Sequence, residues 1–461
     1  MDPQLTAALL AGRIAGSLSR RLGLGGGTVI AGHVVPRLAP RALRTISGRL
    51  RHGVVAVSGT NGKTTTSRII SRILTQAGLR PLHNRAGANL LTGLVTAVSW
   101  DATLQGLPRS NVGVFEVDEA TLPGALKQVT PRALLLTNLF RDQLDRYGEV
   151  HYVAGIWREA IARLPTSTRL VLNADDPLIA ALGEGRDDVV YFGLGDVLQA
   201  ASAEPHAADA RLCSRCGARL RYAVAFYGHL GHYLCPACGL RRPRPQVEAT
   251  AVALDGTQGA HVTLNTPAGR IEFTWRMPGL YNVYNALAAV ATCVSLGARP
   301  EHIQSGLESF TAAFGRLERV AVEGRLLYLA LVKNPVGFTE VIRTITSAEE
   351  RANLMILIND LFADGTDVSW LWDVDFEQLA GRVHFAICGG LRAEDMAVRL
   401  KYALIEPKRI VVENDSRRAL ELALERADPG ETIYVLPTYT AMLELREVLR
   451  RAGYVSGFWE D

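Results

Sequence analysis

A glycine-flanked segment near residue 60 carries the clearest chemistry in this sequence. A short β-branched run at 54–57 leads into Ser58, Gly59, Thr60, Asn61, Gly62, Lys63, Thr64, Thr65 and Thr66, and a helical pattern follows. In a strand–loop–helix setting the loop N–H groups bind phosphate oxygens, the lysine neutralises them, and the first threonine can ligate Mg²⁺. The strict phosphate-loop pattern has a glycine at position 57, where this chain has valine. Apart from that position, residues 59–65 predict an ATP site rather than an ordinary glycine turn.

Four of the six cysteines form a second chemical pattern. Two residues separate Cys213 from Cys216 and Cys235 from Cys238, and 18 residues lie between the pairs. Each pair can present two thiolates to one tetrahedral Zn²⁺, and the spacing is that of a zinc ribbon. Two disulfides are the alternative, which a reducing compartment disfavours. Residues 209–243 are therefore predicted to be a zinc-ribbon insertion with a structural Zn²⁺, and two histidines between the pairs could replace a ligand.

Composition excludes several classes of protein. A hydrophobic content of 48% and a charged content of 21% are typical of a soluble globular chain, and a net charge of +4 gives no argument for nucleic acid. No apolar run in the sequence is as long as the roughly 18 residues that a membrane-spanning helix needs. Arg13 interrupts the apolar run near the N-terminus, and no cleavage site follows, which favours an amphipathic helix over a signal peptide. We expect a cytoplasmic location.

Strands and helices alternate along most of the 461 residues, which predicts two or three α/β domains. Residues 1–50 are expected to be a helical lead-in, 51–312 an ATP-binding domain, and 315–461 a C-terminal domain. Buried parallel strands are predicted in the ATP-binding domain at 112–117, 133–138 and 169–173. In the C-terminal domain they are predicted at 326–332, 353–359, 383–388, 409–412 and 432–436.

Polar residues follow several of these predicted elements. Glu116 lies in an acidic strand end at 115–119, where it could hold Mg²⁺, and Asn138 ends the next strand. Asn282 and Asn285 share one face at the start of a helix. Arg316 follows at the domain junction. Each feature alone is typical of a turn or a helix cap.

In this order the motifs resemble the Mur ligase superfamily, over most of residues 45–461. The resemblance implies a central P-loop ATPase domain with a parallel-rich sheet and a C-terminal Rossmann-like α/β domain. It also implies roles for these residues: Lys63 and Thr64 at the ATP phosphates, Glu116 at Mg²⁺, Asn282 at adenine, and Arg316 at the γ-phosphate. In this family ATP converts a carboxylate to an acyl phosphate, which an amine attacks to form an amide.

Departures from the family pattern narrow the expected substrate. Gln143 stands where most muramyl ligases have a metal-binding histidine, which puts a second Mg²⁺ site in doubt. The usual acidic segment of the C-terminal domain is replaced by one that ends in Lys333-Asn334-Pro335. The roughly 50 residues before the phosphate loop are too few for a uridine-nucleotide-binding domain.

These departures, the cysteine insertion and the segment at 358–373 resemble the ligase subunits of lipid II isoglutaminyl synthases. The resemblance implies amidation of the D-glutamate α-carboxylate of lipid II at the cytoplasmic membrane face. Ammonia would come from a separate glutaminase subunit in a heterodimer. An aspartate of this chain would complete that subunit's Cys–His pair, and Asp367 is our choice over Asp360 and Asp364. A solvated turn is the plainer interpretation of the segment.

Two other functions are compatible with parts of the pattern. A folylpolyglutamate synthase also lacks the uridine domain, but the cysteine insertion and the 358–373 segment are not expected in one. A catalytically inactive scaffold could have lost the missing histidine and acidic groups. Retention of Lys63, Thr64, Glu116 and Arg316 argues against a scaffold, because partner binding needs no phosphate site.

Overall fold

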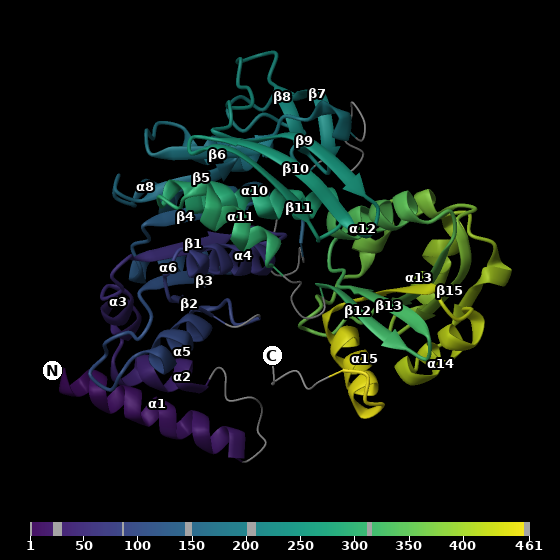
Figure 1. Ribbon diagram of the computed structural model, residues 1–461, viewed down its shortest axis with the longest axis horizontal. Coiled ribbons are helices and arrows are strands. Elements are labelled where there is room, and N and C mark those ends of the chain that lie inside the picture. The colour runs from purple at the N-terminus through teal and green to yellow at the C-terminus, as the bar shows by residue number, and fades with distance from the viewer. Residues whose placement is uncertain are drawn as a thin grey trace.

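The computed structural model of the chain describes residues 2–21, 30–84, 87–142, 150–200, 209–310 and 316–455. Two large sheets organise these residues into two lobes, as Figure 1 shows. A separate two-stranded hairpin carries the cysteine insertion. No helix within the described ranges has the length and apolar character needed to cross a membrane.

The first sheet has nine strands and is mostly parallel. From one edge to the other its order is β2 (Pro81–His83), β3 (Val112–Glu116), β1 (Val54–Ser58), β4 (Ala133–Leu136), β5 (Arg169–Asn173), β6 (Val189–Leu194), β9 (Val247–Asp255), β10 (Gly259–Thr266) and β11 (Gly269–Trp275). All neighbours from β2 to β9 are parallel, and the last three strands form an antiparallel meander. Every residue of β1, β3 and β4 is buried, as expected for parallel strands covered on both faces.

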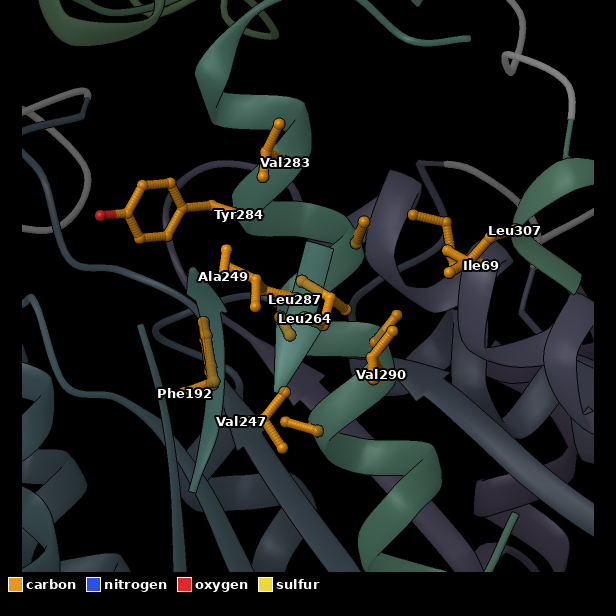
Figure 2. Packing of buried hydrophobic residues seen from close by; sticks show 14 of the residues in the cluster. Ile69, Phe192, Val247, Ala249, Leu264, Val283, Tyr284, Leu287, Val290 and Leu307 are labelled. Atoms are coloured by element: carbon orange, nitrogen blue, oxygen red, sulfur yellow. The ribbon is translucent and has the colours of Figure 1, made fainter. Parts of the chain in front are cut away.

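Helices cover both faces of this sheet and create two hydrophobic cores. One face is covered by α4 (Lys63–Gln76), α10 (Leu280–Ser295) and α11 (Pro300–Glu308). Figure 2 shows Val283, Leu287 and Val290 of α10 near Ile69 of α4 and apolar side chains of β6, β9 and β10. The helices on the other face are α1 (Pro3–Arg21), α2 (Ile30–Leu38), α3 (Ala42–Ser47), α5 (Leu91–Asp101), α6 (Leu122–Gln128) and α8 (Val150–Ala162). Short helices α9 (Pro177–Ala180), η1 (Ala181–Gly183) and η2 (Val197–Gln199) follow β5 and β6.

The second sheet has six strands and lies in the C-terminal lobe. Its order is β12 (Arg316–Val322), β13 (Arg325–Ala330), β17 (Thr432–Pro437), β14 (Ala352–Leu357), β15 (Val383–Gly389) and β16 (Ile410–Val412). Only β12 runs antiparallel to its neighbour. The remaining elements of this lobe are α12 (Pro335–Ala348), η3 (Ser369–Asp373), η4 (Phe376–Leu379), α13 (Ala393–Tyr402), η5 (Pro407–Arg409), α14 (Ser416–Arg426) and α15 (Tyr439–Arg451).

The prediction of an α/β chain with parallel-rich sheets is confirmed. Each of the five strands predicted for the C-terminal lobe is present, with ends that differ by at most two residues. Three helices, α1, α2 and α3, lie within the described parts of 1–50. The domain limits and the Rossmann-like description stay predictions.

Candidate active site

The phosphate-binding loop lies between β1 and α4, at the carboxyl ends of the parallel strands. Gly59 has a φ of 136° and Gly62 a φ of 84°, backbone conformations that residues other than glycine rarely adopt. A Cβ on Gly59 would lie 2.1 Å from Oγ1 of Thr137, and a Cβ on Gly62 would lie 1.9 Å from Oδ1 of Asn285. Only glycine therefore fits at either position, which explains the loop sequence sterically. Thr64, Thr65 and Thr66 follow in α4 and are buried.

Lys63, the first residue of α4, turns back over this loop. Its Nζ donates to the carbonyl oxygens of Gly59 at 2.6 Å and Thr60 at 3.2 Å, and it lies 2.9 Å from Oε2 of Glu119. Both partners of the ion pair are buried, and burial raises the pKa of the Glu119 carboxyl while Lys63 lowers it. We did not single out Glu119 from the sequence, although it closes the acidic run that contains Glu116. Its carboxylate holds the lysine at the loop.

Glu116 ends β3, beside β1, and presents a carboxylate oxygen that a cation could use. Its Oε2 is buried and has no hydrogen-bond partner among the described residues. Asn84 fixes the backbone of Glu116, because its Oδ1 accepts from the Glu116 N–H and its Nδ2 donates to the carbonyl oxygen. His83 lies close enough for the Glu116 charge to raise its pKa, but burial has the larger effect and lowers it. A buried carboxylate oxygen without a donor fits the oxygen ligands that Mg²⁺ prefers.

Asn138, which follows β4, supports the loop from the neighbouring strand. Its backbone oxygen accepts from the Thr60 N–H, and its side-chain Oδ1 accepts from the Asn61 N–H at 2.8 Å. Its Nδ2 donates to the carbonyl oxygen of Asn61. The structure therefore brings Asn138 to the loop backbone, where it fixes the loop conformation.

The start of α10 brings the two predicted asparagines to the same site. Nδ2 of Asn282 donates to the Pro278 carbonyl oxygen, and Nδ2 of Asn285 donates to Oδ1 of Asn282. Oδ1 of Asn285 accepts from the hydroxyl of Thr66 in α4. Asn285, which we had not assigned a role, is thus the member of the pair that touches the phosphate-loop region.

The C-terminal lobe contacts the loop through the start of α12. Asn61 and Asn334 form a reciprocal amide pair, with Nδ2-to-Oδ1 distances of 2.9 and 3.3 Å. Oδ1 of Asn334 also caps α12 by accepting from the Gly337 N–H. Lys333 forms an ion pair with the buried Asp142, just after β4. The Lys333-Asn334-Pro335 segment, which replaces the family's acidic segment, therefore reaches the nucleotide-binding loop.

Two further residues of the sequence analysis lie partly or wholly outside the described part of the structure. Arg316 begins β12, where its backbone pairs with Ala330, but its side chain lies outside the described part of the structure. Gln143, on which the second Mg²⁺ site depends, also lies outside the described residues.

The aspartates of the 358–373 segment lie in the C-terminal lobe and differ in their environments. Asp360 is paired with Arg392 at 2.6 Å. Asp364 is buried and accepts from both the N–H and the hydroxyl of Thr440 at the start of α15. Asp367 is exposed, and the N–H of Ser369 donates to its Oδ1, which lowers the pKa of Asp367.

The four patterned cysteines converge on one point. All are free, and their sulfur atoms lie within 4.8 Å of one another. The Cys213–Cys238 and Cys216–Cys235 sulfur distances are 3.6 and 3.5 Å. Zinc–sulfur bonds of about 2.3 Å in a tetrahedron place sulfurs roughly 3.8 Å apart, so the arrangement fits one Zn²⁺. It does not fit two disulfides, whose sulfurs bond at about 2 Å.

A hairpin formed by β7 (Arg221–Tyr227) and β8 (Leu230–Leu234) links this cluster to the site. His229 at its tip is fully buried, 3.2 Å from the Asp176 carboxylate, with its ring centroid 4.9 Å from that of Phe140. The hydroxyl of Thr60 accepts from the Phe140 N–H and donates to its carbonyl oxygen. The two histidines between the cysteine pairs are not part of the sulfur cluster: His229 contacts Asp176, and His232 bonds the Leu194 carbonyl. The hairpin tip therefore supports the phosphate-binding loop from behind.

Comparison with known proteins agrees with this geometry. Residues 57–232 match the Mur ligase middle domain, and residues 331–442 match the MurT ligase C-terminal domain. The "Lipid II isoglutaminyl synthase (glutamine-hydrolyzing) subunit MurT" of Staphylococcus aureus strain N315 is 33% identical over 97% of this chain and 98% of its own length. The protein of the same name from Streptococcus pneumoniae strain R6 is 34% identical over 97% and 98% of the two chains. The chain belongs to the MurT family of Mur ligases.

Solved structures share the fold at lower identity. A pseudomurein peptide ligase type C from Methanothermus fervidus has a TM-score of 0.67 and 23% identity, covering 87% of this chain and 78% of the other. The folylpolyglutamate synthase of Mycobacterium tuberculosis has a TM-score of 0.62 and 15% identity, covering 89% and 94%. As a MurT-family member the chain is an ATP-dependent ligase, so the scaffold alternative is wrong.

Proposed function

We propose that this chain is the ligase subunit of a lipid II isoglutaminyl synthase. The match to MurT subunits over 97% of the chain carries the proposal. The substrate is the α-carboxylate of the D-glutamate in the lipid II stem peptide, and the product is D-isoglutamine. Folylpolyglutamate synthase is disfavoured, because its likeness to this chain is one of fold at 15% identity.

The reaction has two steps. A carboxylate oxygen attacks the γ-phosphorus of ATP, ADP leaves, and an acyl phosphate forms. Ammonia then attacks the acyl carbon, and phosphate leaves as the nitrogen loses a proton, which gives the amide. Both steps depend mainly on positioning and charge neutralisation.

Residues of the described loop have clear tasks in this scheme. Residues 59–65 would bind the phosphates, and Lys63 would exchange part of its contact with Glu119 for them. Thr64 and Glu116 would hold Mg²⁺, which when bound neutralises phosphate charge. Asn282 would contact adenine and Arg316 the γ-phosphate. Asn138 and Asn334 would keep the loop in place from two sides.

Zinc is proposed as the ion held by Cys213, Cys216, Cys235 and Cys238, with a structural role. We also propose domain limits of 1–50, 51–312, with the insertion at 209–243, and 315–461. The change from the first sheet to the second between β11 and β12 supports the boundary near 312–315.

Ammonia is proposed to come from a glutaminase subunit bound to the C-terminal lobe, with Asp367 completing its Cys–His pair. Asp367 is solvent-exposed, whereas Asp360 and Asp364 are engaged within the lobe. On the same segment Phe362 is 80% exposed and Trp372 is 53% exposed, a degree of apolar exposure that favours a protein partner.

Mass spectrometry of lipid II tests the proposal. Three arms are needed: this protein with ATP and ammonium, the protein with a glutaminase subunit, ATP and glutamine, and that pair without ATP. We expect a hydroxyl-to-amine mass change at the D-glutamate α-carboxyl in the ATP arms only. Lys63→Ala should abolish it, whereas the exposed Lys127→Ala should not. Glutamate addition to a folate, with lipid II unchanged, would reject the proposal.

A further inference from the structure

Helix α1 presents an apolar face to solvent. Its inner face includes Leu5 and Leu9, which are 2% and 0% exposed, and Gly12, which packs against Val35 of α2. On the opposite side Leu10, Ile14 and Leu18 are 48%, 52% and 51% exposed. Residues four apart lie on one side of a helix, so these three form a continuous stripe. We call this set the α1 stripe.

More exposed apolar residues adjoin the first turns of α1. Leu38 at the end of α2 is 44% exposed, and its carbonyl oxygen accepts from the Gln4 side chain. Leu107, which is 51% exposed, follows Gly106, and Gly106 lies against Leu5. Figure 1 shows α1 along the outer edge of the molecule, beside α2 and away from the C-terminal lobe.

The same region is strongly basic. Residues 1–50 contain seven arginines, no lysine and one aspartate, a net charge of +6, whereas the whole chain carries +4. The other 411 residues are therefore slightly acidic. Arg37, Arg41 and Arg44 of this region are exposed. The whole chain therefore has a small net charge although its N-terminal helices are basic and its other residues are slightly acidic.

We propose that the α1 stripe and the exposed arginines of residues 30–50 dock the protein on an anionic lipid bilayer, with α1 in the plane of the interface. Apolar side chains beside arginines are what an interfacial helix needs, since the former enter the acyl boundary and the latter meet lipid phosphates. Two other partners fit this surface less well. A nucleic acid would not contact the apolar side chains of the α1 stripe, and a second copy of this chain would bring two basic surfaces together.

Docking through α1 would also be compatible with the position of the active site. Gly32 of α2 lies directly against Thr92 in the first turn of α5, since a Cβ there would be 1.9 Å from the Thr92 oxygen. The segment before α5 contains Asn84, which holds the backbone of Glu116. The path of contacts from α1 to the backbone of Glu116 therefore runs through α2, α5 and Asn84. This role for docking rests on the proposed function, because it assumes a substrate anchored in the bilayer.

Co-sedimentation with substrate-free vesicles tests docking separately from catalysis. The full chain is mixed with phosphatidylcholine vesicles with or without phosphatidylglycerol. We expect binding to the anionic vesicles that weakens with salt, and a loss of at least about tenfold in L10E/I14E/L18E. The control V197E/L198E/L254E adds the same charge at other exposed apolar positions and should bind like the wild type. Ile14→Trp should keep binding, and melting temperatures verify folding.

Several outcomes would overturn the inference. These are equal vesicle binding by both triple variants, loss of binding in I14W, or a dimer that L10E/I14E/L18E dissociates without any vesicle binding by the wild type. Binding to duplex DNA but not to phosphatidylglycerol would do the same. Vesicle binding by a protein that amidates no lipid II would instead reject the proposed function and leave docking standing. If both hold, L10E/I14E/L18E should lose activity on vesicle-embedded lipid II but keep it on a tail-less analogue.

Discussion

At the scale of single residues, the site is a set of polar side chains each held by a partner far away in the sequence. Lys63 is held by Glu119, the loop backbone by Asn138, and the Glu116 backbone by Asn84. Burial strengthens these contacts electrostatically and makes the loss of one partner costly.

Asp367→Asn should suppress amidation with glutamine while activity with ammonium stays close to that of the wild type. A carboxylate is needed only to orient the partner's histidine, so the ligase reaction itself does not depend on it. Initial rates with the two nitrogen sources give the comparison, and Asp360→Asn is the matched variant in the same segment. Equal losses with both nitrogen sources would place Asp367 in the ligase reaction instead.

Glu340→Gln should stabilise the protein at pH 8 but not near pH 4.5. Burial in α12 raises the pKa of Glu340 to about 7, although Arg343 lowers it. The folded state therefore binds a proton that the unfolded state loses above pH 4.5, and stability falls as pH rises from about 4.5 to 7. The loss amounts to at most about 3 kcal/mol. Melting temperatures at the two pH values measure it, with the exposed Glu350→Gln as control. A difference that does not depend on pH would contradict this explanation.

At the scale of elements, the cysteine insertion does more than stabilise itself. Its hairpin places His229 on Phe140, whose backbone bonds Thr60, and Arg343 of α12 donates to the Phe226 carbonyl oxygen in β7. The hairpin thus contacts both the phosphate-binding loop and the C-terminal lobe. Loss of a metal from the cysteine cluster should therefore disturb ATP binding as well as stability.

Cys213→Ser with Cys216→Ser should remove zinc, lower the melting temperature and raise the KM for ATP. Zinc binding contributes directly to folding of such clusters, and the hairpin tip loses its anchor without it. Metal content by mass spectrometry, thermal melting and ATP kinetics are the measurements. Cys293→Ala, a buried cysteine outside the cluster, should keep zinc and the KM for ATP. Unchanged melting and activity in the double variant would reject the structural role.

At the scale of the whole molecule, two lobes meet at the nucleotide-binding loop. The Asn61–Asn334 pair and the Lys333–Asp142 ion pair join α12 to this loop, and Arg141 contacts Asp373 at 3.0 Å. Because Asn334 both caps α12 and contacts the loop, the orientation of the second lobe and the loop conformation are linked.

Asn334→Ala should lower kcat/KM for ATP in amidation, since both the cap and the contact with Asn61 are lost. Loss of the cap alone costs about 1 kcal/mol in stability. Asp415→Ala is the matched control, because Asp415 caps α14 in the same lobe by accepting from the Arg418 N–H. We expect similar melting temperatures for the two variants but reduced activity for Asn334→Ala only. Equal activities would mean that the contact between lobes has no part in catalysis.

Features with local signals could be predicted from the amino-acid sequence alone. Short residue spacings identify the phosphate-binding loop and the two cysteine pairs, and apolar runs identify the C-terminal strands. The ATP site, the possible zinc site and an α/β fold could therefore be predicted from these signals. Gly59 and Gly62 were identifiable for the same reason.

Contacts between residues far apart in the sequence became visible only in the folded structure. Glu119 against Lys63, Asn334 against Asn61, and His229 against Phe140 join segments whose spacing carries no signal, because chain folding rather than local periodicity brings them together. The α1 stripe is a further case. Apolar residues on both sides of α1 look alike in the sequence, and only the packing of one side on α2 shows that the other faces solvent.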